Sequence, residues 1–207
     1  MGGHVVEDRT TPAEKPPMER SNEAEPDQLE VARSEGDAYA KALDAMRKEE
    51  GGVVASAGNY LVGFVNEQAE GMYALEPSQG LVWREAPEEA NAHLEVAVAD
   101  AADGRFVPGL DVTVTLLGER QLFTAQAPFL WHPFLYHYGF NAKVPGSGPF
   151  TVRIHIEPPS WMRHDPKNGA RYGGPVDVVF EDVPFEPGRK PSPEAAPRGE
   201  PTDYAKP

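Results

Sequence analysis

The chain of 207 residues contains no cysteine, and this absence removes several classes of chemistry. Without thiolates there is no disulfide framework, no iron–sulfur cluster and no cysteine nucleophile. Any metal site must use histidine, methionine and carboxylate side chains. The sequence also lacks the Gly-x-Ser-x-Gly, HExxH and phosphate-loop patterns of common hydrolases and nucleotide enzymes. We therefore expect a protein that is not an enzyme.

Positive charge and long apolar runs are scarce as well. Lys and Arg number 19 against 33 Asp and Glu, and the formal net charge of -14 opposes binding to nucleic acid and to anionic lipid. The longest apolar-leaning stretch, residues 53–65, is too short and too interrupted to span a bilayer. The first 22 residues lack the apolar segment of an export signal. We expect a soluble chain without direct membrane insertion, and its location stays open.

Composition divides the chain into four parts. Residues 1–26 and the proline-rich residues 186–207 are predicted to be flexible, because they contain too few large apolar side chains to offset the entropy of ordering. Residues 27–52 favour a helical segment, either one helix or two short ones, with Gly36 interrupting its apolar stripe. Residues 53–185 are predicted to form a single domain.

Within this domain the apolar residues alternate with a period of two. The stretch AHLEVAVAD, residues 92–100, places leucine and valines on one face and His93, Glu95 and Ala97 on the other. Some eight such strands, separated by Gly and Pro turns, have no helices between them. This pattern predicts an all-β fold: an immunoglobulin-like antiparallel β-sandwich with an N-terminal helical segment and flexible tails.

Four side chains are candidate metal ligands. His93 and Glu95 leave the same face of one strand with Cα atoms roughly 6–7 Å apart, although an outward His-x-Glu pair is also typical of a solvated face. His137 and His164 lie on separate loops, and two prolines precede the second loop. Three imidazoles and one carboxylate suit copper(II), iron or zinc better than calcium or magnesium. From the residues alone it stays open whether the four meet.

Four stretches follow one another in a distinctive order: AHLEVAVAD, HYGFNAKVPGSGPFTVRIHIEPPS, RHD and PVDVVFED. In this order and spacing they resemble the bacterial iron-transport family of small periplasmic proteins, over roughly residues 70–185. The resemblance implies an immunoglobulin-like homodimer that binds copper or iron and is encoded with ferrous-iron permeases. It also implies that His93, Glu95, His137 and His164 are the metal ligands, and that the loop after the two prolines swings His164 over the site.

The chain departs from the family at one ligand. The family has a methionine several residues before the His-Tyr-Gly histidine, whereas this chain has Phe129 and Leu130 near that place. Loss of the soft thioether disfavours copper(I) and leaves copper(II), iron, manganese and zinc as candidates. His132 or Met162 could replace the missing ligand, or the loop could simply pack against the domain.

Together these observations predict a non-enzymatic, transition-metal binding protein that captures or delivers copper or iron in iron uptake. Its expected partners are the metal ion, a second copy of the chain and a membrane permease. Metal affinity is expected to fall as pH drops through the histidine range, because the imidazoles bind in neutral form. The alternative is an immunoglobulin-like protein or small-ligand interaction module that has lost the metal site and uses its aromatic loop: Phe129, Trp131, Phe134, Tyr136 and Tyr138.

Overall fold

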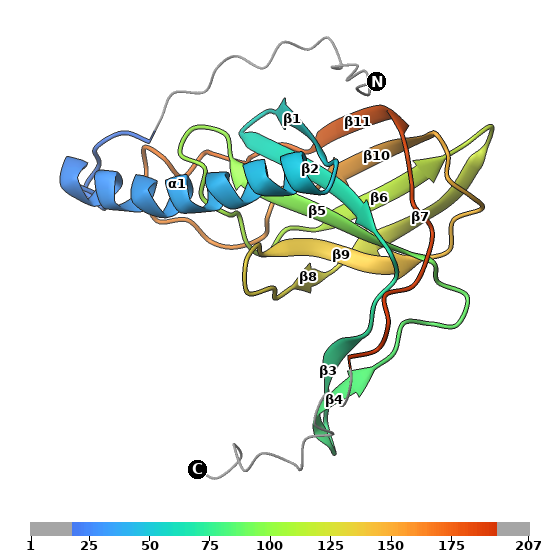
Figure 1. Ribbon diagram of the computed structural model, residues 1–207. Coiled ribbons are helices and arrows are strands. Elements are labelled where there is room, and N and C mark those ends of the chain that lie inside the picture. The colour runs from blue at the N-terminus through green and yellow to red at the C-terminus, as the bar shows by residue number, and fades with distance from the viewer. Residues whose placement is uncertain (1–17, 194–207) are drawn as a thin grey trace.

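Alternating apolar side chains build an antiparallel β-sandwich, as predicted (Figure 1). The computed structural model describes residues 18–193. Its elements in chain order are α1 (Pro26–Glu49), β1 (Val53–Ala57), β2 (Tyr60–Glu67), β3 (Met72–Glu76), β4 (Gly80–Arg84), β5 (Ala92–Asp100), β6 (Val112–Leu117), β7 (Gln121–Ala127), β8 (Phe129–Leu130), β9 (His137–Ala142), β10 (Phe150–Ile156) and β11 (Val176–Val183). One sheet has the strand order β1-β2-β5-β9-β8 and the other β11-β10-β6-β7.

The core lies between the inner faces of these two sheets. Leu94, Val96 and Val98 of β5 are fully buried there, together with Val114 of β6 and Ile154 of β10. Burying each such side chain contributes about 1.5–3 kcal/mol relative to leaving it in water. β10 ends at Ile156, shortly before the proline pair, because proline cannot donate to the β-ladder.

The predicted helical segment forms one continuous helix of 24 residues. Pro26 occupies its first turn, where a missing backbone donor is tolerated, and Glu25 and Gln28 form a capping box. Gly36 does not break the helix. Instead it lies against the 101–105 turn, where an added Cβ would stand 1.6 Å from the backbone oxygen of Asp103. Glycine at this position therefore allows a close approach between helix and domain.

α1 covers the outer face of the first sheet (Figure 1). Leu43 and Met46 pack against Ala97 of β5, and the neighbouring strand offers Gly63, where a Cβ would lie 2.6 Å from Leu43 Cδ1. Small residues in the sheet thus receive large residues from the helix. All nine residues of β5 are buried, so the face that carries His93 and Glu95 is not the solvated face that the sequence left open as an alternative.

The polar ends that were predicted to be flexible fall partly outside the described residues, at 1–17 and 194–207. The described parts of both ends lie against the domain. Ser21 Oγ donates a hydrogen bond to the Asp165 carboxylate at 2.8 Å, and the Arg189 guanidinium donates to nearby backbone carbonyls. The packed unit therefore extends beyond the predicted boundaries at both ends.

A two-stranded hairpin of β3 and β4 projects from the sandwich (Figure 1). Its exposed side chains include Leu75 and Leu81, and Tyr73 meets the half-buried Trp83 edge to face at 5.2 Å between ring centroids. The chain that follows β11 runs back along the base of this hairpin. Within residues 18–193 no helix combines the length and the apolar character needed to cross a membrane.

Candidate metal centre

Three neighbouring strands direct polar side chains to the outer face of the first sheet. In the antiparallel register His93 of β5 lies between Glu67 of β2 and Asn141 of β9. Glu95, two residues further along β5, lies beside Gly139 of β9. Because side chains alternate along a strand, these residues share one face with His137, two residues before Gly139.

His93, Glu95 and His137 form the candidate metal centre. Glu95 Oε1 lies 3.6 Å from His93 Nε2 and 3.7 Å from His137 Nε2. One ligand atom from each of the three residues lies within 4.8 Å of the other two. The exposed fractions are 0% for His93, 8% for Glu95 and 3% for His137. Two imidazole nitrogens and one carboxylate oxygen therefore face one point that a metal ion could occupy after small adjustments.

Both histidines present ring nitrogens without hydrogen-bond partners among the described residues. These atoms are Nδ1 and Nε2 of His93 and Nε2 of His137. The other nitrogen of His137, Nδ1, lies 2.9 Å from the backbone oxygen of Leu135 and donates to it. This bond fixes the tautomer in which Nε2 offers its lone pair to the centre. Buried polar atoms without partners are costly, and a bound cation would satisfy them.

Burial shifts the pKa values of the three groups in opposite directions. It lowers the pKa of His93, and it lowers that of His137 to about 4, because a charged imidazole is poorly solvated there. Burial, followed by the charges of Glu67 and Glu50, raises the pKa of Glu95 to about 8. Near neutral pH the imidazoles are thus ready to bind metal, and the proton that a metal must displace belongs to Glu95 rather than to a histidine.

The location of His137 differs from the sequence prediction. It is the first residue of β9, a central strand of the sheet, and not part of a loop. The sequence HYGFNA gives no clear strand signal, because Gly139 and Asn141 interrupt the alternation of apolar residues. Gly139 is needed where it stands: an added Cβ would lie 2.6 Å from the backbone oxygen of Leu94.

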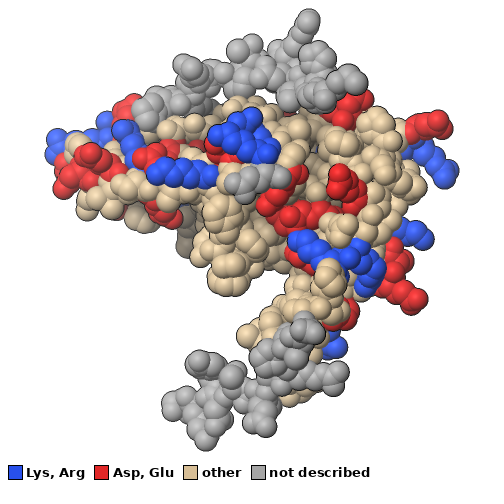
Figure 2. Space-filling model, viewed as in Figure 1, with Lys and Arg blue, Asp and Glu red and all other residues tan. Residues whose placement is uncertain are grey.

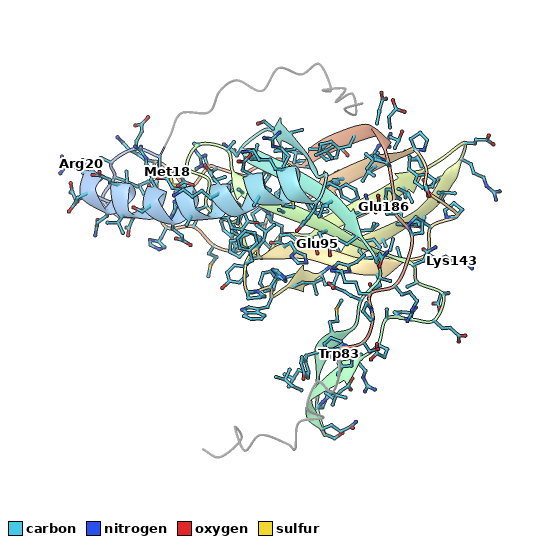
Figure 3. All side chains as sticks on the ribbon, viewed as in Figure 1. Met18, Arg20, Trp83, Glu95, Lys143 and Glu186 are labelled. Atoms are coloured by element: carbon cyan, nitrogen blue, oxygen red, sulfur yellow. The ribbon has the colours of Figure 1, made fainter. Side chains whose placement is uncertain are left out.

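The structure places His164, the fourth predicted ligand, away from the centre. Its side chain is 87% exposed, and its Nδ1 lies 3.1 Å from Glu23 Oε2. Glu23 precedes α1 in the chain, and Arg20, three residues before it, is labelled at the far left of Figure 3, whereas Glu95 lies at the centre of that view. Residues 26 and 43 of α1 alone are separated by about 26 Å along its axis. The loop after the two prolines does not swing His164 over the site within one chain.

The two candidate replacements for the missing methionine also differ in position. The ring centroid of His132 lies 6.0 Å from that of His137. Its Nδ1 accepts hydrogen bonds from the backbone of Phe134 and Leu135, both at 3.3 Å. Met162 is 97% exposed on the loop that carries His164. Of the two, His132 is the neighbour of the centre.

Sequence reasoning missed three charged residues beside the centre. The carboxylates of Glu67, Glu70 and Glu95 lie within 4.8 Å of one another, and Glu70 Oε1 lies 3.9 Å from His93 Nε2. Lys190, from the segment that was predicted to be flexible, forms ion pairs with Glu67 and Glu70. In an acidic chain no sequence signal distinguishes these glutamates, because only the fold brings them together.

Known proteins resemble this chain in sequence and in fold. Residues 55–186 match the family model described as Fe2+ transport protein. The "as isolated" FetP of uropathogenic Escherichia coli, expressed in the E. coli periplasm, is 26% identical with a TM-score of 0.51 and covers 65% of this chain and 95% of its own. A copper-bound glutamate-to-glutamine variant of FetP is 24% identical, with a TM-score of 0.54 and coverage of 70% and 95%.

A more distant structure has the same fold. The copper-reconstituted P19 protein from Campylobacter jejuni is 17% identical, with a TM-score of 0.54, and covers 67% of this chain and 96% of its own. A comparison with curated protein sequences found no match.

Proposed function

Because the chain belongs to the Fe2+ transport protein family, we propose that it captures or delivers a transition-metal ion held by His93, Glu95 and His137. The observation that carries this proposal is a pair of buried imidazoles whose free nitrogens converge on one carboxylate. Binding and release require no reaction, so the proposed role is not enzymatic. A membrane permease is the proposed partner in metal exchange.

Copper and iron are the favoured ions. Imidazole nitrogens suit copper, iron and zinc, and a carboxylate adds preference for a divalent ion without excluding manganese. The copper-bound FetP and P19 structures support copper for proteins of this fold. The three proposed ligands include no thioether, which favours copper(II) over copper(I).

The direct test is metal loading of the full chain without a histidine tag. The protein is incubated separately with copper(II), iron(II), manganese(II) and zinc(II), and bound metal per chain is counted by mass spectrometry after desalting. We expect about one ion per chain in the wild type and loss of that ion in a His93→Ala, His137→Ala double variant. A His155→Ala variant is the matched control, because His155 lies on β10 in the other sheet.

Metal retained equally by the double variant would show that these histidines are not the ligands. No metal retained by the wild type under any condition would favour the alternative function, an interaction module. The exposed aromatic side chains near the centre support that alternative: Phe129, Trp131, Phe134 and Tyr136 are 48%, 70%, 59% and 44% exposed.

We further propose that the chain forms a homodimer in which His164 of one copy completes the centre of the other. Within one chain His164 is exposed and pairs with Glu23, before the start of α1, and the exposed aromatic side chains offer a contact surface. Sedimentation analysis tests the oligomeric state. Mixing His137→Ala with His164→Ala chains tests the shared site.

A mixed dimer would contain one centre with all four ligands, so metal binding should partly return relative to either variant alone. If His164 acted within its own chain, or not at all, mixing would restore nothing beyond the average of the two variants.

A further inference from the structure

The segment that follows β11 is fixed to the domain beside the candidate metal centre. Phe185 is buried in the core, and the backbone nitrogen of Gly188 donates to Asn91 O at 2.7 Å. The backbone nitrogen of Lys190 donates to Ala69 O at 2.9 Å. The guanidinium of the preceding residue, Arg189, donates hydrogen bonds to nearby backbone carbonyls. The position of Lys190 is therefore set by the backbone on both sides.

The side chain of Lys190 lies on the carboxylates that adjoin the centre. Its ammonium nitrogen is 2.8 Å from Glu70 Oε2 and also pairs with Glu67. Glu70 in turn approaches His93, a buried imidazole that lacks a hydrogen-bond partner in the described chain. The Lys190 ammonium thus already pairs with two carboxylates, and one of them, Glu70, adjoins the proposed ligand His93.

A cavity of about 540 Å³ adjoins the pair of Glu67 and Lys190, and we call it the mouth; the three candidate ligands lie beyond its lining. Its lining includes Glu50, Glu67, Glu186 and Lys190. Figure 2 shows acidic side chains gathered beyond the C-terminal end of α1, with basic side chains beneath them. The negative end of the helix dipole adds to the carboxylates, because Glu50 is the C-cap of α1. The mouth therefore attracts cations, and among its lining residues Lys190 supplies the positive charge.

We propose that Lys190 is a built-in competitor for the metal ion, a claim that rests on the proposed function. Its ammonium holds the Glu67 and Glu70 carboxylates in the metal-free protein. An incoming divalent ion passes through the mouth, displaces the ammonium from these carboxylates and reaches His93, Glu95 and His137. Lys190 thereby weakens metal binding and limits it to ions whose charge and ligand bonds outcompete an ammonium group.

Substitution of Lys190 tests this role. Lys190→Gln removes the charge, and the apparent affinity for copper(II) and zinc(II), measured by chelator competition, should rise roughly ten-fold because a repulsive charge close to the ion is gone. Lys190→Arg keeps the charge and should stay near the wild-type affinity. Lys41→Gln, on the exposed side of α1, makes the same change in net charge away from the mouth and should leave the affinity unchanged.

A measurement on the unaltered chain tests the displacement itself and does not depend on the folding of a variant. In NMR spectra of the metal-free protein, the Lys190 ammonium should show hydrogens protected from exchange by its two ion pairs. Titration with zinc(II), which is diamagnetic, should move the side-chain signals of Lys190 and abolish this protection at one equivalent. The signals of Lys41 should not respond.

The outcomes separate this proposal from the proposed function. If the wild type binds metal through the two histidines but Lys190→Gln has wild-type affinity and the ammonium signals do not move, the role of Lys190 is wrong and the function stands. Equal gains in metal affinity in Lys190→Gln and Lys41→Gln would show that only net charge matters, and this outcome would also overturn the proposed role of Lys190. If the wild type binds no metal, both proposals fail together.

Discussion

The two ends of β5 both bury ionisable side chains, but only one end satisfies them. At the C-terminal end, Asp100 is 1% exposed and every carboxylate oxygen has partners. Oδ1 accepts from the backbone nitrogens of Ala102 and Asp103, and Oδ2 accepts from Arg171 Nε at 3.0 Å and from the Tyr172 hydroxyl at 2.6 Å. This end is a closed polar network that holds the 101–105 turn and the loop before β11 to the sheet.

At the other end of the same strand, His93 and Glu95 are buried without comparable partners. In the described chain neither ring nitrogen of the histidine has a hydrogen-bond partner of ordinary geometry, although Asn141 lies close enough to influence its pKa, and the carboxylate lies 3.6 Å or more from either imidazole. Native structures rarely leave buried polar atoms in this state unless the site serves a purpose other than stability. The comparison teaches that burial of charge alone does not identify a binding site, whereas several unpartnered ring nitrogens that converge on one carboxylate mark a candidate.

Removal of the Asp100 carboxylate from its polar network should have the largest effect on stability. Asp100→Ala leaves the Arg171 guanidinium without its carboxylate and two backbone nitrogens without acceptors. We expect a loss of about 3–5 kcal/mol in the free energy of unfolding, measured by urea denaturation. Asp177→Ala, which removes an exposed carboxylate, is the control and should change stability by no more than about 0.5 kcal/mol. Equal losses in the two variants would refute the contrast.

Substitution of Glu95, at the end of β5 that lacks partners, should increase the free energy of unfolding of the metal-free protein rather than decrease it. The Glu95 carboxyl has a pKa of about 8 in the folded chain against 4.5 for an ordinary glutamate. The folded state therefore holds the proton more tightly, and the penalty for ionising Glu95 grows as pH rises from 4.5 to 8. Glu95→Gln should stabilise the fold at pH 8 by on the order of 2–4 kcal/mol, and by little at pH 5.

Urea denaturation in the presence of a chelator, at pH 5 and pH 8, measures this difference. A variant that is less stable than the wild type at both pH values would show that Glu95 serves the fold rather than metal binding.

Metal affinity should depend on pH through the same carboxyl group. A metal ion must displace the proton of Glu95 below pH 8, so affinity should fall by up to about ten-fold per pH unit as pH decreases from 8. His137 adds a further loss only near pH 4, because burial lowers its pKa to about 4, and burial lowers the pKa of His93 as well. Glu95→Gln should bind more weakly at pH 8 but with a flatter profile down to pH 5. Chelator competition across this range would contradict us if both proteins lost metal around pH 6.5.

The smallest effect is expected at a histidine that already has partners. Despite partial burial, which opposes it, hydrogen bonds to Glu157 and Asp177 raise the pKa of His155. Its pairs are largely exposed, so His155→Ala should change stability by no more than about 0.5 kcal/mol and leave metal loading unchanged. Loss of metal in this variant would mean that a partnered surface histidine contributes to binding.

The inner face of the sandwich could be read from the sequence because it depends on local alternation. Leu94, Val96 and Val98 lie in the core as predicted, and His93 and Glu95 lie together on the opposite face. That this second face is buried could not be predicted, since the cover comes from α1 and from the segment after β11, which are distant in sequence.

The rest of the centre depends on contacts that leave no local signal. His137 sits on a strand whose glycine and asparagine serve the site rather than the β-pattern. Glu70 and Lys190 meet across more than half of the chain. The resemblance to a family implied that His164 is a ligand. A sequence motif, however, does not determine where the loop that carries His164 lies within a single chain.

The three tryptophans give the molecule an optical property. None of the three lies in the sandwich core: Trp83 is on the hairpin, and Trp131 and Trp161 are 70% and 37% exposed. We therefore expect tryptophan emission to change less on unfolding than it would for an indole buried in the core. Trp131, however, adjoins His132, whose ring lies 6.0 Å from the ring of His137. Copper(II) in the centre would quench the fluorescence of Trp131 selectively. Metal binding to the unlabelled protein could then be followed by its tryptophan fluorescence.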